Sequence, residues 1–324
     1  MYWGKTIVLS IKFPREFLGD VKPYEIGSGQ NGVVYRVTNN DNGEKLALKY
    51  NYCDDKCQWC PKSDSGTPIC RQCTMIEKEF EFLEQNKENP WLITPHKKYD
   101  LEPIDPKDPT RYCGFTMEVC SGMGGSVGEL SFYKAQLMAK DLGRGLMLLH
   151  AKGYDHGDVR SPNIVYCKDD DVYKLIDPVG GYIDLDKTYH GRTGAQEYER
   201  LLSRDIHMLG YTLYEFYNYV SSNYYDVEWL DKDEEYYMNK IDIVREKLKV
   251  DLFNVKDQEE FNELWFKHFL STLMRKNYIP DLEEAFKHPF ITGEDPCLPE
   301  FEIGTQTGAT KYSKFRSADI PSKI

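Results

Sequence analysis

Hydrophobic and polar residues alternate along short segments in the N-terminal part of the chain. The clearest are 5–13, 24–37, 45–50 and 112–120, which are also rich in β-branched and aromatic residues. A period of two is typical of strands with one buried face. The turn 39–43 consists of Asn, Asp and Gly, which tolerate the positive φ of hairpin turns. We therefore predict a small antiparallel sheet.

Further along the chain, apolar residues recur at intervals of three and four. This spacing predicts a helix with one buried face over 74–84. It also predicts a long core helix over 131–151 and a second core helix over 205–216. The C-terminal part of the chain is therefore expected to be mainly helical.

Length and composition indicate two lobes. A chain of 324 residues exceeds the usual size of one compact core. A glycine-rich break at 121–126 separates the strand-rich part from the helical part. We place an N-terminal lobe at 1–120 and a C-terminal lobe at 121–292. Residues 293–324 lack hydrophobic periodicity and are expected to form a loosely attached tail.

The charge balance and the apolar runs limit the partners. Asp and Glu number 53 against 41 Lys and Arg, which gives a net charge of −12. This charge disfavours nucleic acid and anionic membranes, and it is compatible with a basic protein substrate. The chain has no run of about 18 apolar residues, and 1–10 holds too short an apolar run for a secretory signal. We expect a cytoplasmic protein without a membrane partner, or one in the host cytosol if it is viral or a secreted effector, and leave its oligomeric state open.

Three polar residues within 156–177 suit phosphoryl transfer from ATP. Asn163 follows Asp158 by five positions, and Asp177 ends a short predicted strand. Asp158 can orient an attacking hydroxyl and accept its proton, while Asn163 and Asp177 supply oxygen ligands to Mg²⁺. Asp and Asn are also common turn formers, so the stretch by itself is compatible with an ordinary loop.

A glycine motif interrupts the second predicted strand. Gly27, Gly29 and Gly32 remove the Cβ atoms from a strand-turn-strand, so that backbone N–H groups can approach phosphate oxygens. In a dinucleotide-binding fold this motif would open a helix, whereas here 33–35 continues as strand. The motif therefore predicts a flap over nucleotide phosphates.

In their order along the chain, these features resemble the eukaryotic-type protein kinase family, with Ser/Thr-like character. The resemblance covers roughly residues 20–292 and ends in 284–291, which is similar to the closing helix of the family. It implies an α+β, bilobal kinase-like fold with a small antiparallel sheet and one helix in the N-lobe and a mainly helical C-lobe. It also implies a protein kinase that uses Mg-ATP to phosphorylate a protein hydroxyl, Ser/Thr rather than Tyr.

The resemblance implies how ATP is held. Lys49 would bind the α- and β-phosphates and pair with Glu79, which we choose over Glu77 because 82–83 then lie on the packed face of the helix. The glycines would cover the phosphates, the backbone of 118–119 would meet the adenine edge, and other side chains would line the adenine pocket. The further positions expected to contact ATP are Gly27, Gly29, Gly32, Val34, Ala47, Met117, Glu118 and Val119.

The resemblance also implies roles in the transfer step. Asp158 would be the catalytic base and Arg160 the cation beside the transferred phosphate. Asn163 and Asp177 would bind Mg²⁺, or Mn²⁺ in its place. Asp205 would anchor the backbone of the catalytic loop. Singly, these groups also have structural explanations, such as solvated side chains for Lys and Glu or a helix N-cap for Asp205.

Departures from the family bear on regulation and substrate. Gly157 stands where the family has an arginine that reads activation-loop phosphorylation, so an active enzyme should not need that phosphate. Pro178 should restrain the segment that follows Asp177, and 177–205 lacks the Ala-Pro-Glu of the family. These features favour a pseudokinase scaffold as one alternative. The combination of His-Gly-Asp with Arg160 keeps a small-molecule kinase, of the aminoglycoside or choline type, as another.

Two Cys-x-x-Cys pairs predict a structural Zn²⁺ site in an insertion over 53–73. The ligands would be Cys57, Cys60, Cys70 and Cys73, with Cys53 as a substitute. Reduced or redox-active thiols are the alternative. A zinc knuckle directly before the helix of Glu79 would fix that helix or recruit a partner. The other cysteines, expected to be packing residues or free thiols, are Cys113, Cys120, Cys167 and Cys297.

Overall fold

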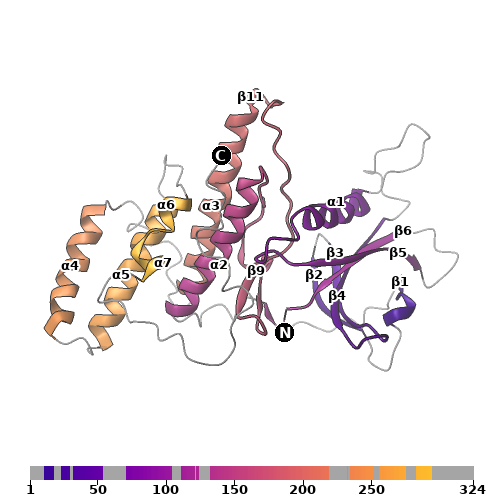
Figure 1. Ribbon diagram of the computed structural model, residues 1–324, viewed down its shortest axis with the longest axis horizontal. Coiled ribbons are helices and arrows are strands. Elements are labelled where there is room, and N and C mark those ends of the chain that lie inside the picture. The colour runs from indigo at the N-terminus through magenta and orange to yellow at the C-terminus, as the bar shows by residue number, and fades with distance from the viewer. Residues whose placement is uncertain are drawn as a thin grey trace. The chain divides into compact units, whose positions relative to one another are not determined.

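The computed structural model describes residues 11–17, 23–29, 32–53, 71–103, 111–120, 122–123, 132–218, 232, 234–250, 255–274 and 282–293. The chain is α+β and divides into two compact units, Met1–Val119 and Cys120–Ile324. The first unit contains an antiparallel sheet and one long helix, and the second is mainly helical (Figure 1). The expected fold class is therefore confirmed. The predicted tail beyond Gly293 lies outside the described residues.

The sheet of the first unit has the strand order β1-β5-β6-β4-β3-β2, and all of these neighbours are antiparallel. The glycine motif lies in the hairpin of β2 and β3, at one edge of this sheet. The strands are β1 (Ile11–Lys12), β2 (Tyr24–Gly29), β3 (Gly32–Thr38), β4 (Lys45–Cys53), β5 (Pro95–Pro103) and β6 (Arg111–Glu118).

Side chains along β4 alternate between the two faces of the sheet. Leu48 and Tyr50 belong to a buried hydrophobic cluster on one face. Lys49 lies on the opposite face, where helix α1 (Arg71–Gln85) packs against β4 and β6. The predicted helix 74–84 is thus present and begins earlier than expected. Its apolar residues Ile76 and Leu83 are almost fully buried, as an amphipathic helix requires.

The second unit is built on packed helices with two small sheets. Helix α2 packs against α3, and α3 against α5, around leucines of α2 and α3 that are fully buried (Figure 1). The longer helices are α2 (Phe132–Ala151), α3 (Gly194–Asn218), α4 (Glu234–Val250) and α5 (Val255–Met274), followed by the short α6 (Leu282–Ala285) and α7 (Pro289–Thr292). The small sheets contain β7 (Gly122–Met123), β8 (Ile164–Cys167) and β9 (Val172–Leu175), and the pair β10 (Thr188–Tyr189) and β11 (Arg192–Thr193).

Helix α3 begins at Gly194, well before the start predicted at residue 205. Its first turns carry mainly polar side chains, so they lack the apolar stripe on which that prediction depended. The sequence signal for the true start is a capping box at its N-terminus. The backbone N–H of Gln196 donates to the Thr193 hydroxyl at 3.3 Å, and the backbone N–H of Thr193 donates to the Gln196 side chain at 3.0 Å.

Across the ranges that the structure describes, we find no helix with both the length and the apolar character needed to cross a membrane.

Candidate functional site

A buried ion pair joins β4 to α1 in the first unit. The Nζ atom of Lys49 lies 2.8 Å from Oε1 and 2.7 Å from Oε2 of Glu79. The two residues are 1% and 8% exposed, which excludes solvated side chains at both positions. Removing two charges from water is costly, so the pair requires the close, two-pronged geometry that it has here.

Two further contacts hold α1 against the sheet near this pair. The ring of Phe80, next to Glu79, lies edge-on to Phe115 of β6 with centroids 5.6 Å apart. Phe115 is itself the register partner of Lys49 across β4 and β6. At the start of the helix, Cys73 is joined by a disulfide to Cys113 of β6. Helix α1 therefore cannot shift along the sheet without breaking packed and covalent contacts.

The disulfide corrects the expectations for two cysteines. Cys113 is not a free thiol, and Cys73 in this state has no thiolate to offer a zinc ion, because thiolates are the form that binds zinc. The other predicted ligands, Cys57, Cys60 and Cys70, lie outside the described residues. A site made by all four cysteines would require reduction of the bond between Cys73 and Cys113.

The residues expected to line the adenine pocket share one face of the sheet with Lys49. Val34 is the register partner of Lys49 across β3 and β4, and Met117 is the partner of Ala47 across β4 and β6. Ala47 lies two positions from Lys49, so strand alternation directs both side chains to the same face. Four of the positions that the sequence singled out thus share one surface, although they come from three different strands.

The glycine motif contains glycines with different structural requirements. Gly32 has φ +130°, and a Cβ atom there would lie 2.5 Å from the carbonyl oxygen of Tyr50, so the fold itself requires glycine. A Cβ atom on Gly27 would meet no atom of the described residues within 4 Å. The open space at Gly27 is compatible with close approach of a ligand to the β2 backbone.

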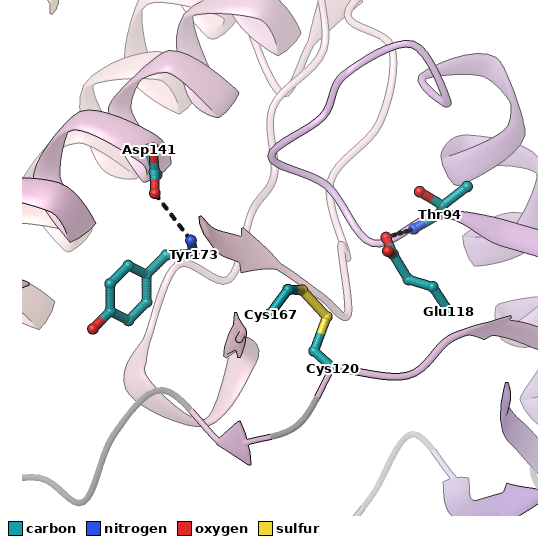
Figure 2. The surroundings of a disulfide bond; sticks show 6 residues. All are labelled: Thr94, Glu118, Cys120, Asp141, Cys167 and Tyr173. Carbon is teal, nitrogen blue, oxygen red and sulfur yellow. Dashed lines mark hydrogen bonds between the residues drawn. A yellow bond between two sulfur atoms is a disulfide. The ribbon is translucent and has the colours of Figure 1, made fainter. Parts of the chain in front are cut away.

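At the end of β6, where adenine contacts are expected, Glu118 is hydrogen-bonded to Thr94. The backbone N–H of Glu118 donates to the carbonyl oxygen of Thr94 at 3.0 Å. The carboxylate of Glu118 accepts a 2.7 Å hydrogen bond from the backbone N–H of Thr94, as Figure 2 shows. The backbone N–H of Glu118 is therefore already hydrogen-bonded within the chain. The adenine edge would have to meet the carbonyl of Glu118 or the backbone of Val119.

In the second unit, Asp158 is held by its own loop. Its Oδ2 atom accepts hydrogen bonds from Arg160 Nε at 2.8 Å and Asn163 Nδ2 at 2.6 Å. Asn163 Nδ2 also donates to the backbone carbonyl of Asp158 at 3.0 Å. The Asp158 side chain nevertheless keeps 26% of its surface exposed. The carboxylate is therefore both oriented and accessible.

Asp177 and Asn163 lie at the same end of a β-hairpin. Ile164 of β8 is paired with Leu175 of β9, and the backbone N–H of Ile176 donates to the carbonyl of Asn163 at 2.9 Å. Asp177 itself has φ +56°, a left-handed conformation that Asp tolerates better than most residues. The hairpin thus places two residues with oxygen-bearing side chains, of the kind that Mg²⁺ prefers, at its same end.

Asp205 fastens the loop that contains Asp158. It lies inside α3, not at a helix N-terminus, which rules out the N-cap alternative. Its carboxylate accepts the backbone N–H groups of His156 at 2.7 Å and Gly157 at 2.9 Å, and His150 Nε2 lies 3.2 Å away. Burial acts to raise the pKa of Asp205, but the hydrogen bond and charge of His150, followed by His156, hold that pKa below its ordinary value.

Gly157 has a local structural reason to be glycine. Its φ is +82°, and a Cβ atom would lie 2.7 Å from the backbone nitrogen of Gly180. Two charged residues that were not predicted from the sequence lie beside it. Asp155 is buried, and the guanidinium of Arg204 on α3 donates to both the Asp155 carboxylate and the Gly157 carbonyl. The available signal was the acidic Asp155 directly before the His-Gly-Asp motif.

A second disulfide corrects the expectation of free thiols at two other positions. Cys120 is joined to Cys167 at the end of β8, as drawn in Figure 2. Next to this bond, β9 is fixed to α2, because the backbone N–H of Tyr173 donates to the buried Asp141 carboxylate at 3.0 Å. Disulfides are rare in proteins of reducing compartments. The two pairings are therefore at odds with the thiol state expected for a cytoplasmic protein.

Comparisons with known proteins give a partial and distant match. No family model matches the chain. Over 163 residues the chain is 28% identical to the serine/threonine-protein kinase Kist of Homo sapiens, and equally to the Kist proteins of Pongo abelii and Mus musculus. The match covers 47% of this chain and only 36% of each relative. This distant similarity supports a relationship with protein kinases.

Proposed function

We propose that this protein is an ATP-dependent protein kinase that transfers the γ-phosphate of Mg-ATP to a Ser/Thr hydroxyl of a protein. The similarity to a serine/threonine kinase supports the class. The observation that carries the proposal is the state of Asp158, whose carboxylate is held by Arg160 and Asn163 and is still partly exposed. A general base needs both an orientation and access to the substrate proton.

Donor chemistry supports a role for Asn163 and Asp177 in holding the metal of Mg-ATP. Because Asn163 directs its amide nitrogen to Asp158, its oxygen Oδ1 is the atom that remains for a cation. Asp177 adds a carboxylate at the same end of the hairpin. When bound, Mg-ATP would supply the transferable phosphoryl group and neutralise the charge on the phosphates.

Lys49 supports the assignment of the nucleotide phosphates to the first unit. Its ammonium group carries several N–H donors, and Glu79 orients it on the face that also carries Val34 and Ala47.

The contacts and exposure of Arg160 support its assignment as the cation near the transferred phosphate. Its Nε atom is bonded to Asp158, while about half of its side-chain surface is exposed, so the guanidinium can meet an anionic group beside the base.

Labelling with [γ-³²P]ATP tests the proposal. Wild-type protein is incubated with general basic protein substrates and, separately, with a panel of aminoglycosides and choline. Asp158→Asn removes the base and should reduce protein labelling by about 100-fold or more. Asp169→Asn is the matched control, because Asp169 is exposed in the turn between β8 and β9.

The outcomes separate the candidate functions. Protein labelling that Asp158→Asn abolishes and Asp169→Asn preserves supports the proposal. Label found only on small metabolites would replace it with the small-molecule kinase. Wild-type protein that labels nothing would replace it with the scaffold alternative, which predicts partner binding without phosphoryl transfer.

A further inference from the structure

The segment that follows Asp177 is paired with the chain just before Asp158. The backbone N–H groups of Val179 and Gly180 donate to the carbonyl of His156, at 3.0 and 2.9 Å. Further along, the Asp155 N–H donates to the Gly181 carbonyl, and the Ile183 N–H to the Gly153 carbonyl. The segment 179–183 therefore lies directly against 153–156, within the second unit.

Asp155 joins this segment to α3 through its side chain. Its Oδ1 atom accepts the backbone N–H of Gly181 at 3.0 Å, and its Oδ2 atom accepts Arg204 Nη2 at 3.2 Å. The residue is 3% exposed, so these bonds act away from most of the solvent. One buried carboxylate thus connects the segment after Asp177 with a cation on the neighbouring helix.

Arg204 also reaches the loop that contains Asp158. Its Nη2 atom donates to the Gly157 carbonyl at 3.0 Å. A Cβ atom on Gly157 would lie 3.0 Å from this same Nη2 atom. The space beside Gly157 is therefore occupied by the guanidinium of Arg204 from α3. A side chain at position 157 would displace this guanidinium.

Close packing makes the arrangement specific. A Cβ atom on Gly180 would lie 2.2 Å from the carbonyl oxygen of Asp155, so the two backbones approach as closely as glycine allows. Tyr154 and Tyr182 form an isolated antiparallel β-bridge through their backbones, and their ring centroids lie 5.4 Å apart. The charge pair is thus one part of an extended contact.

We propose that Asp155 and Arg204 are positioning residues, a charge pair built into the chain that holds 179–183 against the loop of Asp158. In many switches an added phosphate orders a segment by pairing with an arginine. Here the anion is the carboxylate of Asp155, which is present from synthesis. The segment is therefore ordered without phosphorylation. The proposal deepens the kinase function proposed above and, for its effect on catalysis, rests on it.

Amide hydrogen exchange of the full chain tests the pair directly. The deciding variant is Arg204→Met. It is chosen because Arg204 is about half exposed, whereas Asp155 is buried. We expect exchange in 179–183 to become at least about tenfold faster, since a hydrogen bond to a charged group is lost. Arg200→Met is the matched control. Arg200 lies one turn earlier on α3, is exposed to the same degree and is paired with Glu197 instead.

Two further variants test whether the residues act as a pair. Asp155→Asn keeps an acceptor for Gly181 but removes the charge, and it should give the same increase as Arg204→Met. The double variant should exchange no faster than either single variant, because each one already breaks the pair. Arg204→Lys should restore part of the protection. Unchanged exchange in Arg204→Met, or equal effects of Arg200→Met, would overturn the proposal.

Activity gives a second readout that separates this proposal from the kinase assignment. In wild-type protein treated with a phosphatase, kcat should be unchanged, whereas Arg204→Met should lower kcat by about tenfold or more. Loss of activity after phosphatase treatment would overturn phosphate-independent ordering. If the wild type transfers no phosphate, the kinase assignment fails, and the exchange experiment still decides whether Asp155 and Arg204 order the segment.

Discussion

Lys49 and Glu79 form a buried ion pair in which one ammonium group meets both oxygens of one carboxylate, at 2.8 and 2.7 Å. The lysine belongs to β4 and the acid to α1, so the pair reports the position of the helix on the sheet. A buried pair contributes little net stability, because desolvation offsets its Coulomb attraction. The pair is therefore weak evidence for stability, and the proposed role of Lys49 in holding phosphates would account for an oriented ammonium group at this position.

Breaking the Lys49 and Glu79 pair from one side should be costly. Glu79→Gln removes the carboxylate charge that lies against a buried ammonium group, and we expect the free energy of unfolding to fall by about 3–5 kcal/mol. Urea denaturation measures this change. Glu81→Gln, at an exposed position of the same helix, should change stability by less than about 0.5 kcal/mol. Similar effects of the two substitutions would contradict the burial of the pair.

The disulfide between Cys73 and Cys113 should stabilise the first unit. It closes a loop with a sequence separation of 40 residues, and Cys113→Ser should cost about 2–4 kcal/mol without reductant. With dithiothreitol, the wild type and the variant should have nearly equal stability.

Zinc analysis of the same samples tests the metal prediction, since Cys73 can act as a thiolate ligand only after reduction. Bound zinc that depends on Cys73 in the oxidised protein would contradict the pairing.

Gly32 and Gly27 should respond differently to alanine. Gly32→Ala forces a Cβ atom against the Tyr50 carbonyl at positive φ, and we expect a loss of about 1–3 kcal/mol in stability. The Cβ atom of Gly27→Ala meets no atom of the described residues within 4 Å, so this substitution should leave thermal stability nearly unchanged. If β2 covers a nucleotide, Gly27→Ala should still raise the KM for ATP. Thermal unfolding and ATP titration of the two variants together separate a folding requirement from a binding one.

His288 should make stability depend on pH. Burial, followed by the charge of His268, lowers its pKa from 6.5 to about 3. Below about pH 6.5, His288 is therefore protonated in the unfolded chain but stays neutral in the folded chain. Stability falls as the pH drops, because the unfolded state binds more protons. From about pH 6.5 to about pH 5 this residue should cost at most about 2 kcal/mol.

The matched variant for this prediction is His288→Asn. His288 Nδ1 accepts the backbone N–H of Phe290 at the start of α7, and Asn can supply an acceptor there without a titrating group. Urea unfolding at both pH values should show a shallower pH dependence in the variant. Equal slopes for the two proteins would mean that His288 is not the titrating group.

Local patterns predicted the elements with a clear apolar period. The strands around Lys49, the helix of Glu79 and α2 were found close to their true bounds, because one face of each is buried and its period is visible. The start of α3 was missed for the opposite reason. Its first turns are polar, and only the pairing of Thr193 with Gln196 marks where the helix begins.

The sequence by itself determined which chemical groups are present, their order and spacing, and the α+β class. Only the tertiary structure decided which of them meet. It placed Val34, Ala47 and Lys49 on one face, paired Cys73 with Cys113, and brought Arg204 to Asp155 and Gly157. The physical reason is that strand register, disulfide partners and buried ion pairs depend on contacts between residues distant along the chain. A local pattern in the sequence shows that such a group is present, but it does not identify the residue that the group contacts in the fold.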